Sequence, residues 1–231
     1  MIDLHTHILP EMDDGSKAVE MSIEMLRMER DQGVDSVALT SHFYRDLEKP
    51  EAFFDKRNAS FAKLKNAVES QNESLPKLYL GAEVAWVPGM CDWEELEGFC
   101  YEGTKFILIE PPFQHWTDLF FRELIGLHTR RGLTPVIAHI DRYYKSQKKD
   151  SIDRLLSMEY PIQISAAPFL DFLTKGNALK YIREGKAQLL ISDCHNTSTR
   201  KPNIGPATEV LRKKFGSQIN RLLNETDYIF E

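Results

Sequence analysis

Two histidines near the N-terminus have the spacing of paired metal ligands. His5 and His7 lie two residues apart at the end of a short apolar segment that we expect to form a strand. Side chains at positions i and i+2 of a strand point to the same face, so the two imidazoles project together. Asp13 and Asp14, on the loop that follows, add carboxylates. Imidazole and carboxylate ligands together suit divalent zinc, manganese or iron.

Further histidines and carboxylates recur downstream, most of them at the carboxyl ends of predicted strands. With His5, His7 and Asp14 they make nine candidate ligands. One metal ion takes about four to six ligands, so nine candidates predict more than one ion. His115 and His128 are left out because neither follows a predicted strand. The nine candidates are His5, His7, Asp14, His42, Glu83, Glu110, His139, Asp193 and His195.

The elements that must position these residues alternate between strands and helices along the whole sequence. The strand segments are continuous apolar runs, which are typical of parallel strands covered on both faces. The helical segments carry apolar residues on one face, and some end at a glycine. Besides the strand that begins at Ile2, we expect strands at 36–40, 78–84, 105–109, 134–138, 161–165 and 188–192. We expect helices at 16–32, 50–69, 118–131, 151–158, 173–184, 205–215 and 218–223.

Seven strand–helix units predict an α/β fold with a parallel sheet. A closed barrel and an open doubly wound sheet both fit this pattern. The positions of the ligands favour the barrel, because a closed barrel brings the carboxyl ends of its strands round one mouth, whereas an open sheet spreads them along a line. The chain has 231 residues and shows no linker or repeat, so we expect a single domain over residues 1–231.

The overall composition narrows the class of protein. Hydrophobic residues make up 42% of the chain, which supports a packed core, and the formal net charge of −6 argues against a nucleic-acid surface. No apolar run is long enough to span a membrane, and the N-terminus lacks the pattern of a signal peptide. Three cysteines without a spaced framework suit a reducing compartment, so we expect a cytoplasmic protein without membrane insertion.

Several short motifs, taken together and in order, resemble those of a known superfamily. The segments HTHILPEMDDG, TSH, GAE, EP, AHIDRY and SDCHN look like motifs of the PHP (polymerase and histidinol phosphatase) superfamily. Within it, the DDG loop and the AH-x-x-RY pattern resemble the CpsB/CapC-type bacterial protein-tyrosine phosphatases of capsule and exopolysaccharide synthesis. The family often has glutamate where this chain has Asp141, and this shorter carboxylate puts a supporting hydrogen bond in question.

The resemblance implies a distorted (β/α)7 barrel of the PHP type, similar to a TIM barrel, with three divalent metal ions at the carboxyl ends of its strands. Manganese is the favoured metal, and iron or zinc would also suit the ligands. The resemblance also implies that Glu83 bridges two of the ions. The implied ligands are His5, His7, Glu83 and Asp193 for the first ion, Glu83, Glu110 and His139 for the second, and Asp14, His42 and His195 for the third.

The implied chemistry is hydrolysis of a phosphate monoester. A hydroxide that bridges two metal ions would attack phosphorus in line, because metal binding lowers the pKa of water. Arg142 and Arg200 resemble the arginines of the family's phosphate site, where a planar guanidinium can make two hydrogen bonds to phosphate. The implied partner is a phosphotyrosine protein, a bacterial tyrosine autokinase that controls capsule or exopolysaccharide synthesis.

Aromatic residues on or beside the predicted strand-to-helix loops favour phosphotyrosine over phosphoserine, because their rings can pack against a phenyl ring. The same rings could instead cap the barrel. These residues are Phe43, Tyr44, Trp86, Phe113, Trp116 and Tyr143.

Other functions remain open on the sequence alone. Cys194 and Arg200 have the C-x5-R spacing of cysteine-dependent tyrosine phosphatases, although the HNTST segment between them lacks a glycine. An amidohydrolase-type enzyme also begins with H-x-H, but it needs lysine and histidine where the fourth and sixth strands here end in Glu110 and Ser165. A small-molecule phosphatase, such as a histidinol-phosphatase, is the alternative within phosphatases. A non-catalytic metal-binding module that docks a kinase is the alternative of a different class.

Overall fold

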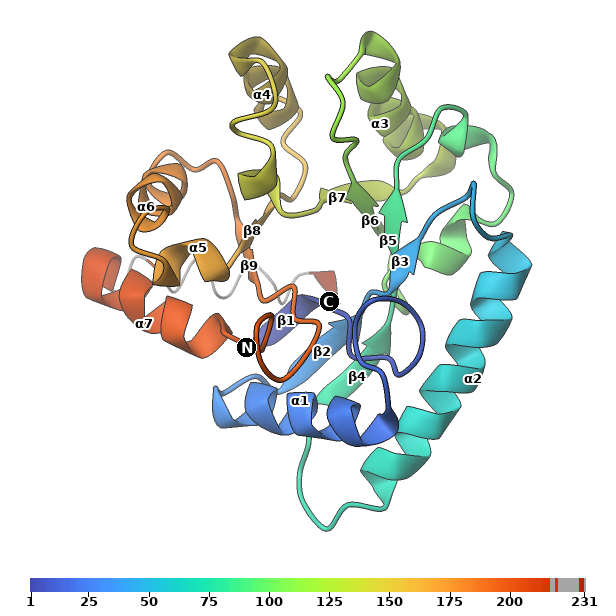
Figure 1. Ribbon diagram of the computed structural model, residues 1–231. Helices are drawn as coiled ribbons and strands as arrows, with labels where there is room; N and C mark the ends of the chain where they lie inside the picture. The colour runs from blue at the N-terminus through green and yellow to red at the C-terminus, as the bar shows by residue number, and fades with distance from the viewer. Residues whose placement is uncertain (217–218, 220–228, 231) are drawn as a thin grey trace.

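Short parallel strands lie at the centre of the molecule, and the helices lie around them (Figure 1). The computed structural model describes residues 1–216, 219, 229 and 230. The strands are β1 (Ile2–Thr6), β2 (Ser36–Leu39), β3 (His42–Phe43), β4 (Lys77–Leu80), β5 (Glu83–Ala85), β6 (Phe106–Glu110), β7 (Thr134–Ile137), β8 (Gln163–Ser165) and β9 (Leu189–Ile191). The helices are α1 (Val19–Asp31), α2 (Pro50–Glu69), α3 (Asp118–Arg131), α4 (Lys149–Leu156), α5 (Ala167–Leu170), α6 (Lys175–Arg183) and α7 (Ile204–Phe215), with short 3-10 helices η1 (Met90–Asp92), η2 (Leu96–Phe99) and η3 (Ile140–Arg142).

The strand pairs are parallel and form three sheets with the orders β1-β2-β4, β3-β5-β6-β7 and β8-β9. Single parallel bridges connect these sheets, because Thr6 pairs with Cys194 beyond β9 and Ile137 in β7 pairs with Ile162 before β8. His7 N also donates a hydrogen bond of 2.9 Å to Cys194 O. The predicted α/β fold with parallel strands is confirmed, and parallel pairing places the carboxyl ends of neighbouring strands on one side.

Side chains along the strands alternate between two separate groups of buried residues, because successive residues of a strand point to opposite faces. Both faces of the sheets are therefore covered, as the continuous apolar runs predict. The smaller group includes Leu4, Ala38, Leu108, Val136 and Leu189. The larger group includes the neighbouring strand residues Val37, Leu39, Ile107, Ile109, Ile137 and Leu190, together with the inward faces of the helices.

The strand predicted at 78–84 is interrupted, which gives β4 and β5. Gly81 lies at the interruption, where its N–H donates to Leu39 O at 3.1 Å and a Cβ would lie 3.1 Å from the Tyr101 ring. The prediction of one continuous strand is wrong, because this local crowding leaves no trace in the apolar pattern. The break occurs beside a matching break between β2 and β3, and the pairing resumes where His42 faces Glu83.

Most other elements differ from the predictions only near their ends. α1 begins at Val19, three residues after the predicted start of its helix. α3 ends at Arg131, as predicted, and the next residue, Gly132, has a φ of +66°. Helix α5 was not predicted, because its four residues are too short for a helical period to show. The helix predicted at 218–223 lies outside the described residues.

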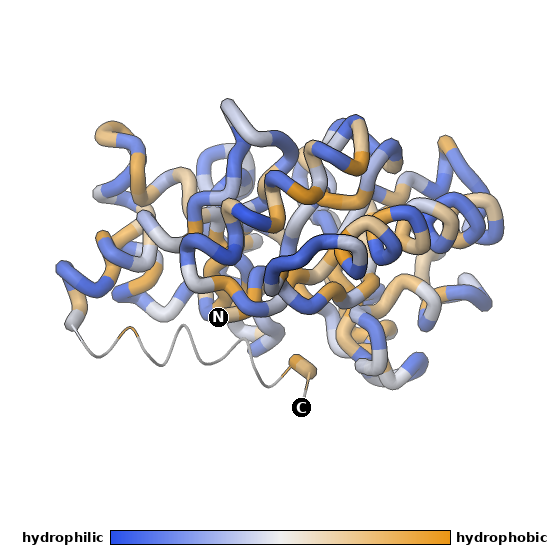
Figure 2. Tube along the Cα trace, turned by 90° about the horizontal axis from the view of Figure 1, so that it is seen from below, coloured by the Kyte–Doolittle hydropathy of each residue, from blue (hydrophilic) through white to orange (hydrophobic). Residues whose placement is uncertain are grey.

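Among the described residues, no helix is long and apolar enough to cross a membrane. Hydrophobic and hydrophilic stretches alternate along the chain trace in Figure 2. This alternation matches helices that bury one face and expose the other.

Candidate metal centre

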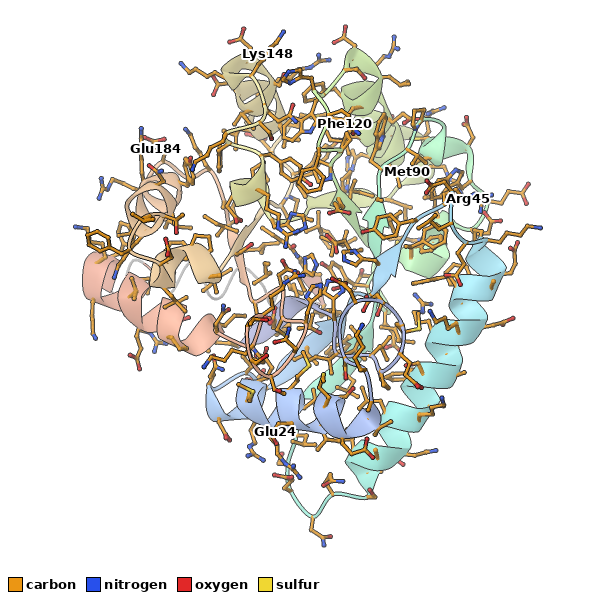
Figure 3. The ribbon with its side chains drawn as sticks, viewed as in Figure 1. Glu24, Arg45, Met90, Phe120, Lys148 and Glu184 are labelled. Carbon is orange, nitrogen blue, oxygen red and sulfur yellow. The ribbon has the colours of Figure 1, made fainter. Side chains whose placement is uncertain are left out.

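The nine predicted ligands converge from seven different loops and strand ends. Each of them belongs to a group of candidate ligand atoms that lie within 4.8 Å of one another. Figure 3 shows nitrogen- and oxygen-bearing side chains gathered in the middle of the fold. Residues separated by nearly 200 positions in the sequence thus form one polar centre, as the prediction of converging strand ends requires. The spatial part of the site prediction therefore agrees with the structure, whereas the metal-binding role of each residue stays a prediction.

The first cluster forms around the two N-terminal histidines, which are fully buried. His5 Nε2 and His7 Nε2 lie 3.2 Å apart. Glu83 Oε2 lies 3.1 and 3.5 Å from these two nitrogens, and Asp193 Oδ1 lies 3.8 and 3.6 Å from them. Two imidazole nitrogens and two carboxylate oxygens therefore face a common point.

The second cluster uses the other oxygen of the same glutamate. Glu83 Oε1 lies 2.7 Å from His139 Nε2, and Glu110 Oε1 lies 3.8 Å from that nitrogen. Glu83 thus belongs to both clusters, through a different oxygen in each.

The third cluster lies nearer the surface. Asp14 Oδ1 is 3.5 Å from His42 Nε2 and 3.3 Å from His195 Nε2. The His7 ring lies beside both of these imidazoles, with centroid separations of 4.4 Å to His42 and 3.8 Å to His195. Asp14 is exposed, so this cluster is the most accessible to solvent.

Several buried atoms of these clusters lack a hydrogen-bond partner, which tests whether the residues fit metal ions. His42 Nδ1, Glu83 Oε2 and His195 Nε2 are buried without one. Glu83 Oε2 lies only 2.8 Å from His42 Nδ1, yet the two atoms lack hydrogen-bond geometry. An unpaired buried polar atom is costly, and a cation at a shared point would satisfy several of them at once. The donor set therefore fits divalent metals.

The close packing of charged groups in the centre shifts the pKa values of several of its residues. Burial favours the neutral imidazole, but the carboxylates of Asp13 and Glu83 raise the pKa of His7 to about 10. Burial and the charge on His7 lower the pKa of His195 to about 3. Burial would raise the pKa of Asp193, but neighbouring cationic groups hold it at about 2. These carboxylates are anionic and require nearby positive charge, which protons on imidazoles or divalent cations can provide.

Backbone strain occurs at two of the predicted ligands. His139 has a φ of +24° and Asp193 a φ of +52°, a region that non-glycine residues rarely adopt. Such strain persists where the surrounding structure requires a particular side-chain position, and it is frequent at functional sites.

Supporting residues orient the first two histidines, and the sequence prediction gave Gln163 no role and named Asp13 only as a carboxylate beside the histidines. Gln163 Oε1 lies 2.9 Å from His5 Nδ1, and Asp13 Oδ2 lies 2.8 Å from His7 Nδ1, so that Nε2 of each ring faces the cluster. Gln163 could have been found from the sequence, because it is a polar residue inside the apolar strand segment PIQIS. The close approach of this loop to His7 requires a glycine at position 15, because a Cβ on Gly15 would lie 2.2 Å from His7 O.

The two predicted phosphate-binding arginines lie side by side on Asp193. Arg142 Nη2 donates to Asp193 Oδ2, and Arg200 Nη2 donates to Asp193 Oδ1 at 2.9 Å. Their side chains keep 32% and 38% of their surface exposed. Both line a cavity of about 350 Å³ that also contains Asp193, one of the candidate ligands, in its lining. Asp141, also in its lining, accepts a hydrogen bond of 2.8 Å from Ser165 N, so the shorter carboxylate still makes a supporting contact.

Cys194 points away from this cavity, as strand alternation predicts. Its side chain is fully buried, and Sγ lies 3.6 Å from Glu29 Oε1 on α1. Burial and the charge of Glu29 raise the pKa of the Cys194 thiol well above its usual value. A buried thiol with a raised pKa is a poor nucleophile, which disfavours the cysteine-dependent alternative.

The aromatic residues predicted to contact a phenyl ring are divided by the structure. The prediction is wrong for Phe43, Trp116 and Tyr143, which are buried in the core. Tyr143 also donates its hydroxyl to Pro111 O at 2.7 Å. These rings pack behind the loops, because burying large aromatic surface in the core is favourable. Phe113 remains 59% exposed, so it alone of the six is a large exposed hydrophobic side chain.

Comparison with known proteins identifies the family. Residues 1–227 match the family described as "Capsular polysaccharide synthesis, CpsB/CapC". The chain belongs to the CpsB/CapC family. Its resemblance to PHP-type phosphatases is thereby confirmed.

Relatives within the CpsB/CapC family cover almost the whole chain. The protein is 30% identical to "Tyrosine-protein phosphatase CpsB" of Streptococcus agalactiae serotype III (strain NEM316), over 94% of this chain and 92% of that protein. It is 30% identical to "Tyrosine-protein phosphatase YwqE" of Bacillus subtilis (strain 168), over 97% of this chain and 89% of that protein.

A solved CpsB/CapC-type structure has a similar fold. It comes from the crystal structures of YwqE from Bacillus subtilis and CpsB from Streptococcus pneumoniae, described as unique metal-dependent tyrosine phosphatases. The TM-score is 0.79 at 28% identity, and the match covers 95% of this chain and 89% of the solved chain.

Proposed function

We propose that this protein is a metal-dependent protein-tyrosine phosphatase, which hydrolyses the phosphate monoester of phosphotyrosine. The observation that carries the proposal is the convergence of nine histidine and carboxylate side chains beside two arginines. Such ligands fit divalent metals, and guanidinium groups fit a phosphoryl group. Membership of the CpsB/CapC family, with relatives named tyrosine-protein phosphatases, supports the same activity.

We further infer a distorted (β/α)7 barrel of the PHP type that forms a single domain over residues 1–231. If β2 with β3 and β4 with β5 each count as one strand, the sheet pairs and the bridges Thr6–Cys194 and Ile137–Ile162 give every strand two neighbours. The separate buried group on one strand face is the expected filling of a barrel interior. The metal clusters then lie at the mouth formed by the carboxyl ends.

The proposed centre binds three divalent ions, with manganese favoured and iron or zinc as alternatives. Bound ions would lower the pKa of water and add positive charge beside the phosphoryl oxygens. His5, His7, Glu83 and Asp193 would hold the first ion, Glu83, Glu110 and His139 the second, and Asp14, His42 and His195 the third.

The protein's own residues would bind and orient the substrate. Arg142 and Arg200 would donate to the phosphoryl oxygens from the cavity wall, because both guanidinium groups keep exposed surface there. Asp193 would fix the two arginines through the hydrogen bonds that it already accepts. Charge-assisted donors aimed at a developing charge stabilise the transition state most when they are fixed in advance.

The substrate proposed is a phosphotyrosine protein, and the proposed partner is a bacterial tyrosine autokinase that controls capsule or exopolysaccharide synthesis. The test compares kcat/KM of the purified protein, with Mn²⁺ added, on a phosphotyrosine peptide, a phosphoserine peptide and histidinol phosphate. We expect the phosphotyrosine peptide to give the highest value. A preference for histidinol phosphate would contradict the tyrosine phosphatase while keeping the metal chemistry, and no turnover of any ester would favour a non-catalytic module.

Replacement of Cys194 should leave the reaction largely intact. Because its thiol is buried and faces Glu29, Cys194→Ser is expected to keep kcat on a phosphotyrosine peptide within about threefold of the wild type. Steady-state kinetics check this, with bound metal measured in parallel. An inactive Cys194→Ser protein that keeps its metals and its fold would instead point to a cysteine nucleophile.

A further inference from the structure

The cavity beside the two arginines continues into a second cavity along α6. The first has a volume of about 350 Å³ and the second about 200 Å³. They share four lining residues and therefore adjoin each other, and we call the two together the α6 groove. Its lining extends from the arginine pair, through residues of α5, of α6 and of the turn between them (orange in Figure 1), to Tyr144 and Lys145 between η3 and α4. The shared residues are Asp141, Arg142, Pro168 and Thr174.

Two large apolar side chains stand exposed at the edge of this groove. Phe172 is 93% and Leu173 is 84% exposed, and they lie between the groove residues Asp171 and Thr174. Asp171 Oδ1 accepts hydrogen bonds of 3.0 Å from Leu173 N, Thr174 N and Thr174 Oγ1. The turn is therefore held in place while it presents both apolar side chains to solvent. Adjacent exposed apolar residues are typical of contact surfaces.

The far end of the groove is aromatic. The rings of Tyr144 and Tyr181 stack with centroids 3.7 Å apart and an interplanar angle of 24°, and both line the second cavity. Lys145 adds an ammonium group to the same lining. This end is thus suited to a peptide segment with apolar side chains, while the arginine end is suited to a phosphate dianion.

We propose that the α6 groove binds the segment of the substrate protein beside the phosphotyrosine, and that Phe172 and Leu173 contact an apolar side chain of that segment. This inference rests on the proposed phosphatase function. The two arginines place the phosphate at one end of the groove, so a polypeptide attached to the phenyl ring must leave over the adjoining surface. A small aryl phosphate would occupy only the arginine end, whereas a peptide would also reach the apolar edge.

The test uses two kinds of substrate to separate phosphate binding at the arginines from contact with the exposed apolar side chains. The double variant Phe172→Ser/Leu173→Ser is measured on p-nitrophenyl phosphate and on two phosphotyrosine peptides, which carry either leucine or aspartate beside the phosphotyrosine. We expect the wild type to prefer the leucine peptide and the variant to lose this preference. For the leucine peptide, kcat/KM should fall by roughly tenfold, the effect of losing burial of one apolar side chain, mainly through a higher KM. Turnover of p-nitrophenyl phosphate should not change.

Two further variants sharpen the result. Ile125→Ser removes an exposed apolar side chain from α3, outside the groove lining. It should leave kcat/KM unchanged for both the small ester and the peptides. Asn177→Trp fills the second cavity from an exposed position on α6 and should raise KM for peptides alone.

The possible outcomes distinguish this inference from the proposed function. Equal kcat/KM for both peptides in the wild type, or an equal loss on the small ester and the peptides in the double variant, would overturn the groove proposal. Failure of the wild type to hydrolyse p-nitrophenyl phosphate with Mn²⁺ would contradict the phosphatase function itself.

Discussion

Glu83→Gln is expected to lower kcat/KM on a phosphotyrosine peptide by roughly 10³-fold, at the upper end for loss of one catalytic group. Glu83 is buried, and its two oxygens lie 3.1 Å from His5 Nε2 and 2.7 Å from His139 Nε2. An amide carries no charge and offers only one acceptor oxygen, so both clusters that share this residue should bind metal more weakly. Steady-state kinetics and metal analysis of the purified variant measure the two effects together.

Glu123→Gln is the matched control for this substitution. Glu123 is also a buried glutamate, but it lies on α3 and accepts a hydrogen bond of 2.7 Å from Gly89 N, which a glutamine can still accept. The control should keep its metals and its activity. A Glu83→Gln protein with normal turnover and a normal metal content would remove the bridging role from Glu83.

Arg142→Ala and Arg200→Ala should each lower kcat by roughly 10²- to 10³-fold, the scale for removal of one fixed transition-state donor. Both guanidinium groups line the cavity and donate to Asp193, so either loss removes a phosphate donor without removing a proposed metal ligand. Metal content should therefore stay close to that of the wild type. Arg→Lys variants should recover only part of the rate, because an ammonium cannot make the bidentate contact.

The separate changes in kcat and KM distinguish stabilisation of the transition state by the arginines from binding of the ground state. A rise in KM with unchanged kcat would mean that the arginines bind the ground state only. Unchanged kinetics in both alanine variants would place them outside the phosphate site. Arg122→Ala, at an exposed position on α3, controls for loss of a surface charge and should behave like the wild type.

The candidate centre could be predicted from the sequence because it consists of histidines and carboxylates at the ends of strands. His5, His139 and Asp193 stand out as polar residues in or directly after apolar segments, and parallel strands bring such positions together. No knowledge of packing was needed for this step. Residues that are far apart in the sequence therefore have candidate ligand atoms within 4.8 Å of one another in the fold.

Other features depend on packing that the sequence does not display. Phe43 is the last residue of β3 and Tyr143 directly follows the 3-10 helix η3, yet both rings turn into the core, because the direction of such a side chain depends on the space behind it. The break at Gly81 depends on the position of Tyr101, which is distant in sequence. The exposure of Phe172 could not be predicted either, because helix α5 and the turn that follows it are too short to show a period.

Metal titration of the stripped protein tests the central claim most directly. The protein is treated with a chelator and dialysed, Mn²⁺ is added back in steps, and bound metal per chain is measured beside phosphate release from a phosphotyrosine peptide. We predict no turnover in the stripped protein, recovery as metal binds, and about three ions per chain at full rate, from the three clusters around His5 and His7, around His139 and around Asp14. A higher melting temperature of the loaded protein should accompany this recovery. Full turnover by protein that contains no bound metal would contradict the account.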